Sequence, residues 1–323
     1  MTVERDGRGG RDRLVERGED GGRGEDGERL QEVADGVFVC VRPDGGWCLN
    51  NSGLIVSGGQ AALVDTAATE PRARRLRAAV LDTAGVAPRT VVSTHSHGDH
   101  TFGNHVFPEA VVVGQERARA EMALAGLHLT GLWPEVEWGE VRLVLPEVTF
   151  AERLTLHVGS TVAELIHPGP AHTAGDTVVW LPGEQVLFTG DVVLSGVTPF
   201  CPMGSVAGSL RAVAALRSLG ARTVVPGHGP VGGPELLDAT EGYLTLVQRL
   251  AREGAAAGLT PLEAARAADL GPYAGWIDAE RLVPNLHRAY GEERGEAVGD
   301  PAQMSALFAE MTEFHGGLPA CHA

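Results

Sequence analysis

Four strand-like apolar segments in this chain are each followed by a turn that carries a potential metal ligand, and this order constrains the fold more than any other feature. The first segment, residues 89–93, is rich in β-branched side chains, which indicates a buried strand. A loop at the end of such a strand can aim several side chains inward. The potential ligands after the four segments are, in chain order, His95, His97, Asp99 and His100, then His172, Asp191 and His228.

Imidazole and carboxylate groups are suitable ligands for a borderline ion such as Zn²⁺. In the motif His95-x-His97, neighbouring side chains can converge on one ion while Asp99 and His100 turn toward a second. The simple alternatives are a solvated histidine-rich turn at residues 94–100 and a helix cap at Asp191. Because the same design returns at four strand ends, we favour metal binding.

The ordered series of these residues resembles the motif series of the metallo-β-lactamase superfamily over roughly residues 33–235. The resemblance implies an αββα sandwich, in which two mixed β-sheets pack face to face with helices outside. It also implies a dinuclear site that holds two Zn²⁺ ions, with iron or manganese as alternatives. In that site the first metal would be bound by His95, His97 and His172, the second by Asp99, His100 and His228, and both by a bridging Asp191.

Residues 61–66 resemble the early strand of the family, which ends in Asp65. There Asp65 would orient the histidine loop, a supporting role that metal sites usually need. An N-cap for the arginine-rich helix expected over residues 71–81 is an equal alternative. Both roles can hold together.

The ligand set defines the expected chemistry. Two zinc ions lower the pKa of water from about 15.7 to about 7 and polarise a carbonyl oxygen. We therefore expect attack on an ester, thioester, amide or phosphoester, or activation of an enolisable carbonyl. Asp99 is the candidate catalytic residue, which would orient the attacking water or pass protons in addition to its ligand role. The four cysteines occupy no ligand position and form no Cys-x-x-Cys pair, and they are Cys40, Cys48, Cys201 and Cys321.

Composition divides the chain into three parts. The first 30 residues contain eight Gly, seven Arg and nine Asp or Glu and no apolar core of a secretory signal. We expect residues 1–32 to form a disordered polar tail, 33–254 the metallo-β-lactamase-fold domain and 255–323 a helical extension that packs on it. Without an apolar run of about 20 residues, we expect a cytoplasmic protein that does not contact membranes. A net charge of −16 argues against nucleic acid as a partner.

Local patterns predict the main elements. Residues 36–41 and 51–56 are typical of a β-hairpin with a turn between them. An irregular segment is expected over residues 127–140, which contain Trp133 and Trp138. Helices are expected over residues 71–81, 115–125, 209–219 and 234–254, and around 261–268, 278–290 and 301–314.

The segment that follows Asp191, residues 192–205, is unusually apolar for a surface loop. Phe200 and Met203 would wall an apolar substrate pocket just beyond a metal ligand. Trp47, on the expected hairpin turn, would cover this pocket from the opposite side. Ordinary packing under the C-terminal helices is an equal alternative for these three residues.

A second resemblance concerns the subtype. Asp191 in the bridging position departs from the true β-lactamases, which argues against antibiotic hydrolysis. Residues 44–51, 198–205 and 280–290 instead resemble the metallo-β-lactamase-type cyclases of aromatic polyketide antibiotic biosynthesis. This resemblance implies a polyketide cyclase that closes a later ring by aldol condensation on a small-molecule or acyl-carrier-bound substrate, with an acyl carrier protein as partner and thioesterase release in some members.

Three other functions fit the same ligands. A generic zinc-dependent thioester or lactone hydrolase, similar to glyoxalase II, needs no further residues, although the C-terminal region offers few basic side chains for an anionic glutathione thioester. A mononuclear iron oxygenase is disfavoured by the complete second set, which includes His100 and His228. A binding module with a relic site is disfavoured because no ligand is missing. The sequence leaves the substrate and the oligomeric state open.

Overall fold

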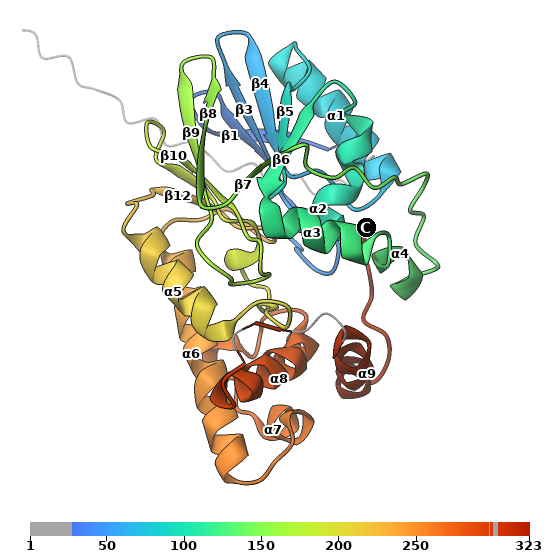
Figure 1. Cartoon of the computed structure of the whole chain (residues 1–323), viewed down its shortest axis with the longest axis vertical. Coiled ribbons are helices and arrows are strands. Elements are labelled where there is room, and N and C mark those ends of the chain that lie inside the picture. The colour runs from blue at the N-terminus through green and yellow to red at the C-terminus, as the bar shows by residue number, and fades with distance from the viewer. Residues whose placement is uncertain (1–27, 297, 300–302) are drawn as a thin grey trace, which may run out of the picture.

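Two mixed β-sheets packed face to face form the centre of the molecule (Figure 1). The computed structural model describes residues 28–296, 298–299 and 303–323. The seven-stranded sheet follows chain order and consists of β1 (Leu30–Ala34), β2 (Val37–Cys40), β3 (Ser52–Ser57), β4 (Gln60–Val64), β5 (Thr90–Val92), β6 (Val111–Gln115) and β7 (Val148–Phe150). The five-stranded sheet has the order β12 (Thr223–Val225), β11 (Val186–Phe188), β10 (Val178–Leu181), β9 (Thr161–Ile166) and β8 (Arg153–Val158).

The core lies between the two sheets because side chains alternate between the faces of each strand. In β4, Ala62 and Val64 belong to the cluster between the sheets, whereas Ala61 and Leu63 pack with the helix outside. Both faces are covered, so the central strands are apolar throughout rather than alternating. This pattern places one sheet against the other and leaves each outer face to a helix.

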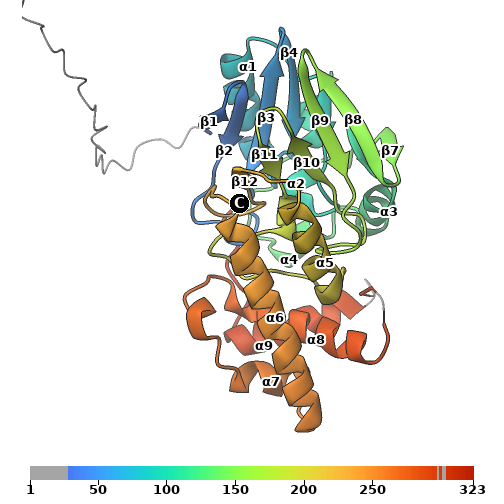
Figure 2. The same ribbon diagram turned by 90° about the vertical axis from the view of Figure 1, so that its left-hand side faces the viewer.

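Helices pack outside both sheets, and Figure 2 shows α5 (Val206–Arg217) at the lower part of the five-stranded sheet, with β8 and β9 uncovered above it. The helix α1 (Glu70–Ala84) packs on the seven-stranded sheet through Leu76 and Val80, and α5 packs on the five-stranded sheet. The further helices of the sandwich are α2 (Gly98–Thr101), α3 (Glu116–Ala125) and α4 (Leu129–Leu132), with 3-10 turns η1 (Phe102–Val106) and η2 (Gly190–Val192).

A helical extension follows the last strand and lies below the sandwich in Figure 1. Its apolar core joins α5 to the extension. From its last helix the chain returns to the sandwich, where Trp133 Nε1 donates a hydrogen bond of 2.7 Å to the Pro319 carbonyl. In the division predicted from the sequence, the long helix α6 (Glu235–Ala256) belongs to the domain, and it leads into the extension. The elements of the extension are α7 (Pro261–Ala267), η3 (Gly271–Tyr273), η4 (Ala279–Arg281), α8 (Leu282–Glu293) and α9 (Met304–His315).

The structure confirms the αββα sandwich and the hairpin of β2 and β3. One boundary is wrong: β1 begins at Leu30, and the buried Glu28 accepts a 2.9 Å hydrogen bond from Cys40 Sγ and pairs with Arg42, so residues 28–32 belong to the domain. The remainder of the expected tail, residues 1–27, lies outside the described residues. Among the described residues, no helix combines the length and apolar character needed to cross a membrane.

Candidate metal centre

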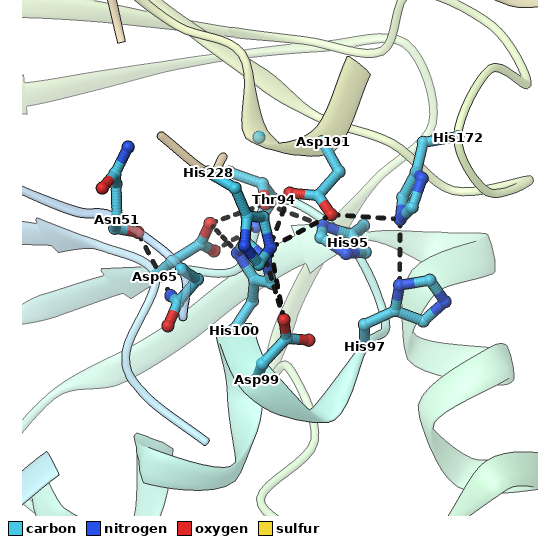
Figure 3. Close-up of polar contacts among 12 residues, drawn as sticks. Asn51, Asp65, Thr94, His95, His97, Asp99, His100, His172, Asp191 and His228 are labelled. Carbon is cyan, nitrogen blue, oxygen red and sulfur yellow. Dashed lines mark hydrogen bonds and ion pairs between the residues drawn. The ribbon is translucent and has the colours of Figure 1, made fainter. Parts of the chain in front are cut away.

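The seven side chains expected as ligands lie together at one edge of the sandwich (Figure 3). They come from loops after β5, β9, β11 and β12. Strands β4 and β5 are parallel, as are β11 and β12, so the carboxyl ends of each pair meet at one edge. Two groups form, in each of which the ligand atoms lie within 4.8 Å of one another: His95, His97, His172 and Asp191, and Asp99, His100 and His228.

In the first group, His172 Nε2 lies 2.9 Å from His97 Nδ1, and His95 packs against both rings. Burial lowers the pKa of His172 to about 3 and lowers that of His95 well below its ordinary value. The imidazoles are therefore neutral at pH 7. A neutral imidazole nitrogen offers a lone pair to a cation.

In the second group, His100 Nε2 lies 3.3 Å from His228 Nε2, and Asp99 Oδ2 lies 3.3 Å from that same His228 atom. Burial favours the neutral form of His228, but Asp191 and Asp99 outweigh burial and raise its pKa to about 9. The carboxylates thus create a site that attracts positive charge, which protons supply when no other cation is bound.

Asp191 reaches both groups. Its Oδ1 lies 3.2 Å from His100 Nε2, and its Oδ2 lies 3.5 Å from His172 Nε2 and 3.4 Å from His228 Nε2. The approach depends on Gly227, because a Cβ there would lie 1.9 Å from Asp191 Oδ1. Glycine is therefore required before His228, because any side chain there would collide with Asp191.

Two observations indicate that these side chains are suited to bind metal ions. His95 Nε2 is buried without a hydrogen-bond partner, which is costly unless another group satisfies it. Imidazole nitrogens also face each other in both groups, His97 Nδ1 with His172 Nε2 and His100 Nε2 with His228 Nε2, as ligands of one ion do. Neutral imidazoles with carboxylates suit Zn²⁺, and a cation would satisfy all of these atoms at once.

Asp65 supports the histidine loop. Its carboxylate accepts hydrogen bonds from Thr94 N at 2.7 Å, Thr94 Oγ1 at 2.7 Å and His100 Nδ1 at 2.8 Å. The His100 contact leaves Nε2 directed to the site. The alternative role as a helix cap is wrong, because Thr69 occupies the N-cap position of α1.

Backbone carbonyls orient two further imidazoles. His228 Nδ1 donates to the Gly45 carbonyl at 3.0 Å, and His172 Nδ1 donates to the Phe200 carbonyl. Since a carbonyl only accepts, each contact places the ring proton on Nδ1 and leaves Nε2 free for a metal.

Two acidic residues that the sequence analysis missed hold the loops of the first group. Glu121 of α3 accepts from Ser96 Oγ at 3.0 Å and from Ala174 N at 3.1 Å, so it links the loops of His97 and His172. Asp176 accepts from Thr173 N, Thr173 Oγ1 and Ala171 N, and burial raises its pKa to about 8. Asp176 could have been found as a turn residue four positions after His172, whereas no local signal marks Glu121.

An aromatic wall adjoins the first group. We use this name for Trp47, Trp133, Phe200 and Phe308. Phe200 lies 6.4 Å from the His97 ring and 5.4 Å from Trp47, which in turn lies 5.7 Å from Trp133 and 6.0 Å from Phe308. The structure thus places Trp47 and Phe200 side by side, whereas the half-buried Met203 does not belong to their cluster. Trp133 and Phe308 are members that sequence spacing did not reveal.

The fold and the paired His and Asp groups define a class of αββα proteins with a metal-binding edge. The sequence profile of the Metallo-beta-lactamase superfamily matches residues 45–228, and the chain belongs to this superfamily. Its members are mostly hydrolytic metalloenzymes.

Individual relatives differ in what they act on. The chain is 32% identical over 265 residues to the hydroxyacylglutathione hydrolase of Anaeromyxobacter dehalogenans, a match that covers 80% of this chain and 89% of the relative. It is 26% identical to a type 2 metallo-beta-lactamase of Bacteroides fragilis, over 66% of this chain and 83% of that protein. A metallo-beta-lactamase structure from Pontibacter korlensis shares the fold with a TM-score of 0.55 and 24% identity, covering 67% of this chain and 98% of its own.

Proposed function

We propose that this protein is a dinuclear zinc enzyme that closes a later ring of a carrier-bound aromatic polyketide by aldol condensation, with thioester cleavage as a second reaction. The observation that carries the proposal is the aromatic wall, which begins at Phe200 beside His97 and His172. Zinc ions held by the two groups would supply a polarised carbonyl and a water of lowered pKa.

We propose that the aromatic wall forms the inner, apolar side of the substrate site, where Trp47, Trp133 and Phe200 are 8%, 5% and 7% exposed. Its four members come from the β2–β3 loop, the segment after α4, the loop after Asp191 and helix α9. The rings pack on one another at centroid distances between 5.4 and 6.0 Å, and an unsaturated chain that reaches this cluster would stack on it. A chain held folded against this cluster brings carbon and carbonyl together, which lowers the barrier to an intramolecular reaction.

Asp99 would accept the proton from the carbon between two substrate carbonyls. Its side chain is 12% exposed, compared with 7% for Asp191 and 0% for His100. It is therefore the carboxylate of the centre that a substrate can best approach. Its Oδ2 also contacts His228 Nε2, which fixes the orientation of the carboxylate.

A second candidate is a thioester hydrolase, favoured by the 32% identity to a hydroxyacylglutathione hydrolase. The arginine that stacks on the aromatic wall is not available to a glutathione thioester. Arg281, which stacks on Trp47 at 4.0 Å, is 3% exposed and pairs with Asp278 at 2.8 Å. This cation is paired within the protein and is not free to bind the carboxylates of glutathione.

A comparison of two substrates separates the two functions. The zinc-loaded protein is given a poly-β-ketone thioester of N-acetylcysteamine and, separately, lactoylglutathione, and products are identified by mass spectrometry. We expect a dehydrated or isomeric cyclic product from the first and slow cleavage of the second. Faster turnover of lactoylglutathione, with no cyclised product, would establish the hydrolase instead.

Two variants complete the test. Replacing the wall residue in Trp47→Ala should raise KM for the polyketide mimic much more than for a short acyl thioester. His97→Ala should abolish both reactions and lower zinc content. If the purified protein holds well under one zinc equivalent and His97→Ala keeps full activity, the metalloenzyme proposal is wrong.

A further inference from the structure

Phe200 contacts both His172 and the rest of the aromatic wall. Its carbonyl oxygen accepts the hydrogen bond from His172 Nδ1, and its ring lies 6.3 Å from the His172 ring and 5.4 Å from Trp47. The same residue thus orients a ligand of the first group and begins the aromatic wall. Its own placement rests on a loop without regular secondary structure, between η2 and α5.

One buried amide in the extension holds the peptide groups on both sides of Phe200. Asn285 Oδ1 accepts from Cys201 N at 2.8 Å, and Asn285 Nδ2 donates to the Pro199 carbonyl at 2.7 Å. Asn285 is fully buried and lies on α8, so the contacts span 84 and 86 residues of sequence.

The turn η4, which precedes α8, makes one further contact with the loop that carries Phe200. Arg281 Nη1 donates to the Thr198 carbonyl at 3.2 Å. The Phe200 loop is therefore attached to the extension along its length, and Asn285 makes the two contacts that flank Phe200.

We infer that Asn285 is a positioning residue for the metal centre, because its amide fixes the Phe200 peptide whose carbonyl orients His172. The inference rests on the metal centre proposed above. A carbonyl that rotates away would leave His172 Nδ1 without its partner, and the imidazole would lose both its orientation and its proton position. Partners of this kind beyond the ligands change metal affinity by about 10- to 100-fold when they are removed.

The chemistry of the amide explains the choice of residue. Asparagine offers one acceptor and two donors, which match a peptide N–H and a carbonyl that flank one residue. Aspartate at this position keeps the acceptor for Cys201 N but has no donor for the Pro199 carbonyl. Leucine has a similar shape and neither polar group. The position lies outside residues 45–228, so it is not part of the sequence that the superfamily profile matches.

The test compares zinc affinity in Asn285→Asp and Asn285→Leu with the wild type. Each protein is titrated against a chromophoric chelator, and Co²⁺ spectra report the ligand field independently of activity. We expect one of the two ions to bind about 10- to 100-fold more weakly in both variants, with an altered Co²⁺ spectrum, while the other ion keeps its affinity. Thermal melting of the zinc-free proteins measures the change in fold stability separately.

Two variants in the same helix are matched controls. Tyr290→Phe removes a 3.2 Å hydrogen bond to the Leu259 carbonyl, and Leu286→Ala opens a cavity in the apolar core that also contains Cys201. Both changes leave the two hydrogen bonds of Asn285 in place. We expect both to bind two zinc ions as the wild type does.

Three results are decisive. Wild-type affinity for both ions in Asn285→Asp or in a folded Asn285→Leu overturns the inference. Equal weakening in Leu286→Ala also overturns it, because general destabilisation of α8 would then explain the effect. A wild-type protein that binds no zinc overturns the metal centre itself, and this outcome is visible before any variant is made.

Discussion

The substitution Asp65→Asn tests whether the carboxylate sets the protonation of His100. The backbone at Asp65 has a φ of 59°, in the left-handed region that asparagine adopts readily, so the change adds no backbone strain. The variant amide oxygen can keep the bond from Thr94 N. Its NH₂ group then takes the place of Oδ2 and faces His100 Nδ1, which now has to accept.

The magnitude follows from this tautomer change. When Nδ1 accepts, the ring proton moves to Nε2, the atom that lies 3.2 Å from Asp191 Oδ1 and would hold the metal. Loss of a hydrogen bond to a charged group costs about 1.5–3 kcal/mol. Since about 1.4 kcal/mol is a factor of ten, we expect zinc to bind about 10- to 100-fold more weakly at the second group.

The assay is zinc competition with a chromophoric chelator, accompanied by urea unfolding of the zinc-free protein. Ser52→Ala is the control, because it removes a neighbouring buried hydrogen bond of 2.8 Å to the Thr66 carbonyl without touching a ligand. We expect the control to keep both zinc affinities. If Asp65→Asn binds both ions within twofold of the wild type, His100 does not depend on Asp65 for its proton position.

Three further predictions concern pH, thiols and metal removal. Burial raises the pKa of Asp176 to about 8 in the folded state, so the native state binds one more proton between about pH 4 and 8 and loses stability as the pH rises. Urea unfolding of the zinc-free proteins at pH 5 and 8 should show a smaller loss in Asp176→Asn, and equal losses would contradict this reasoning. A thiol-specific disulfide reagent should modify Cys321 first, because a hydrogen bond from Cys48 lowers the pKa of this partly exposed thiol. Faster modification of a buried thiol would contradict this prediction, because the pKa of each is raised. The buried thiols are Cys40, Cys48 and Cys201. Zinc at about 100 times its Kd should stabilise the fold by about 2.7 kcal/mol per ion, and a melting temperature that a chelator leaves unchanged would refute zinc binding.

Local patterns were sufficient for much of the fold. Buried strands such as β5 and β11 are short apolar runs that end in glycine-containing turns, and both were predicted from the sequence. The strands β1, β6, β7 and β8 were not predicted. Alternate residues of β8 are exposed, so its pairing with β9, rather than its composition, makes it a strand. Pairing is a long-range property that a local window does not contain.

The ligand order identified the superfamily, because a motif repeated at strand ends reflects local turns and the chemistry of its own side chains. The contacts that support the ligands could not be predicted from the sequence, for the same reason that strand pairing could not. Glu121 joins two loops across 25 and 53 residues, and Trp47 meets Phe308 only after the extension has folded back.

The sequence by itself determined which side chains could bind a metal and at which strand ends they stand. Tertiary structure decided how they divide: Asp191 reaches both groups, while Asp65 supports His100 and does not cap α1. Tertiary structure also decided that α8 holds the Phe200 loop through Asn285. The physical reason is that turn and strand preferences act within a few residues, whereas ligand geometry depends on contacts between segments that only the packing of two sheets and an extension brings together.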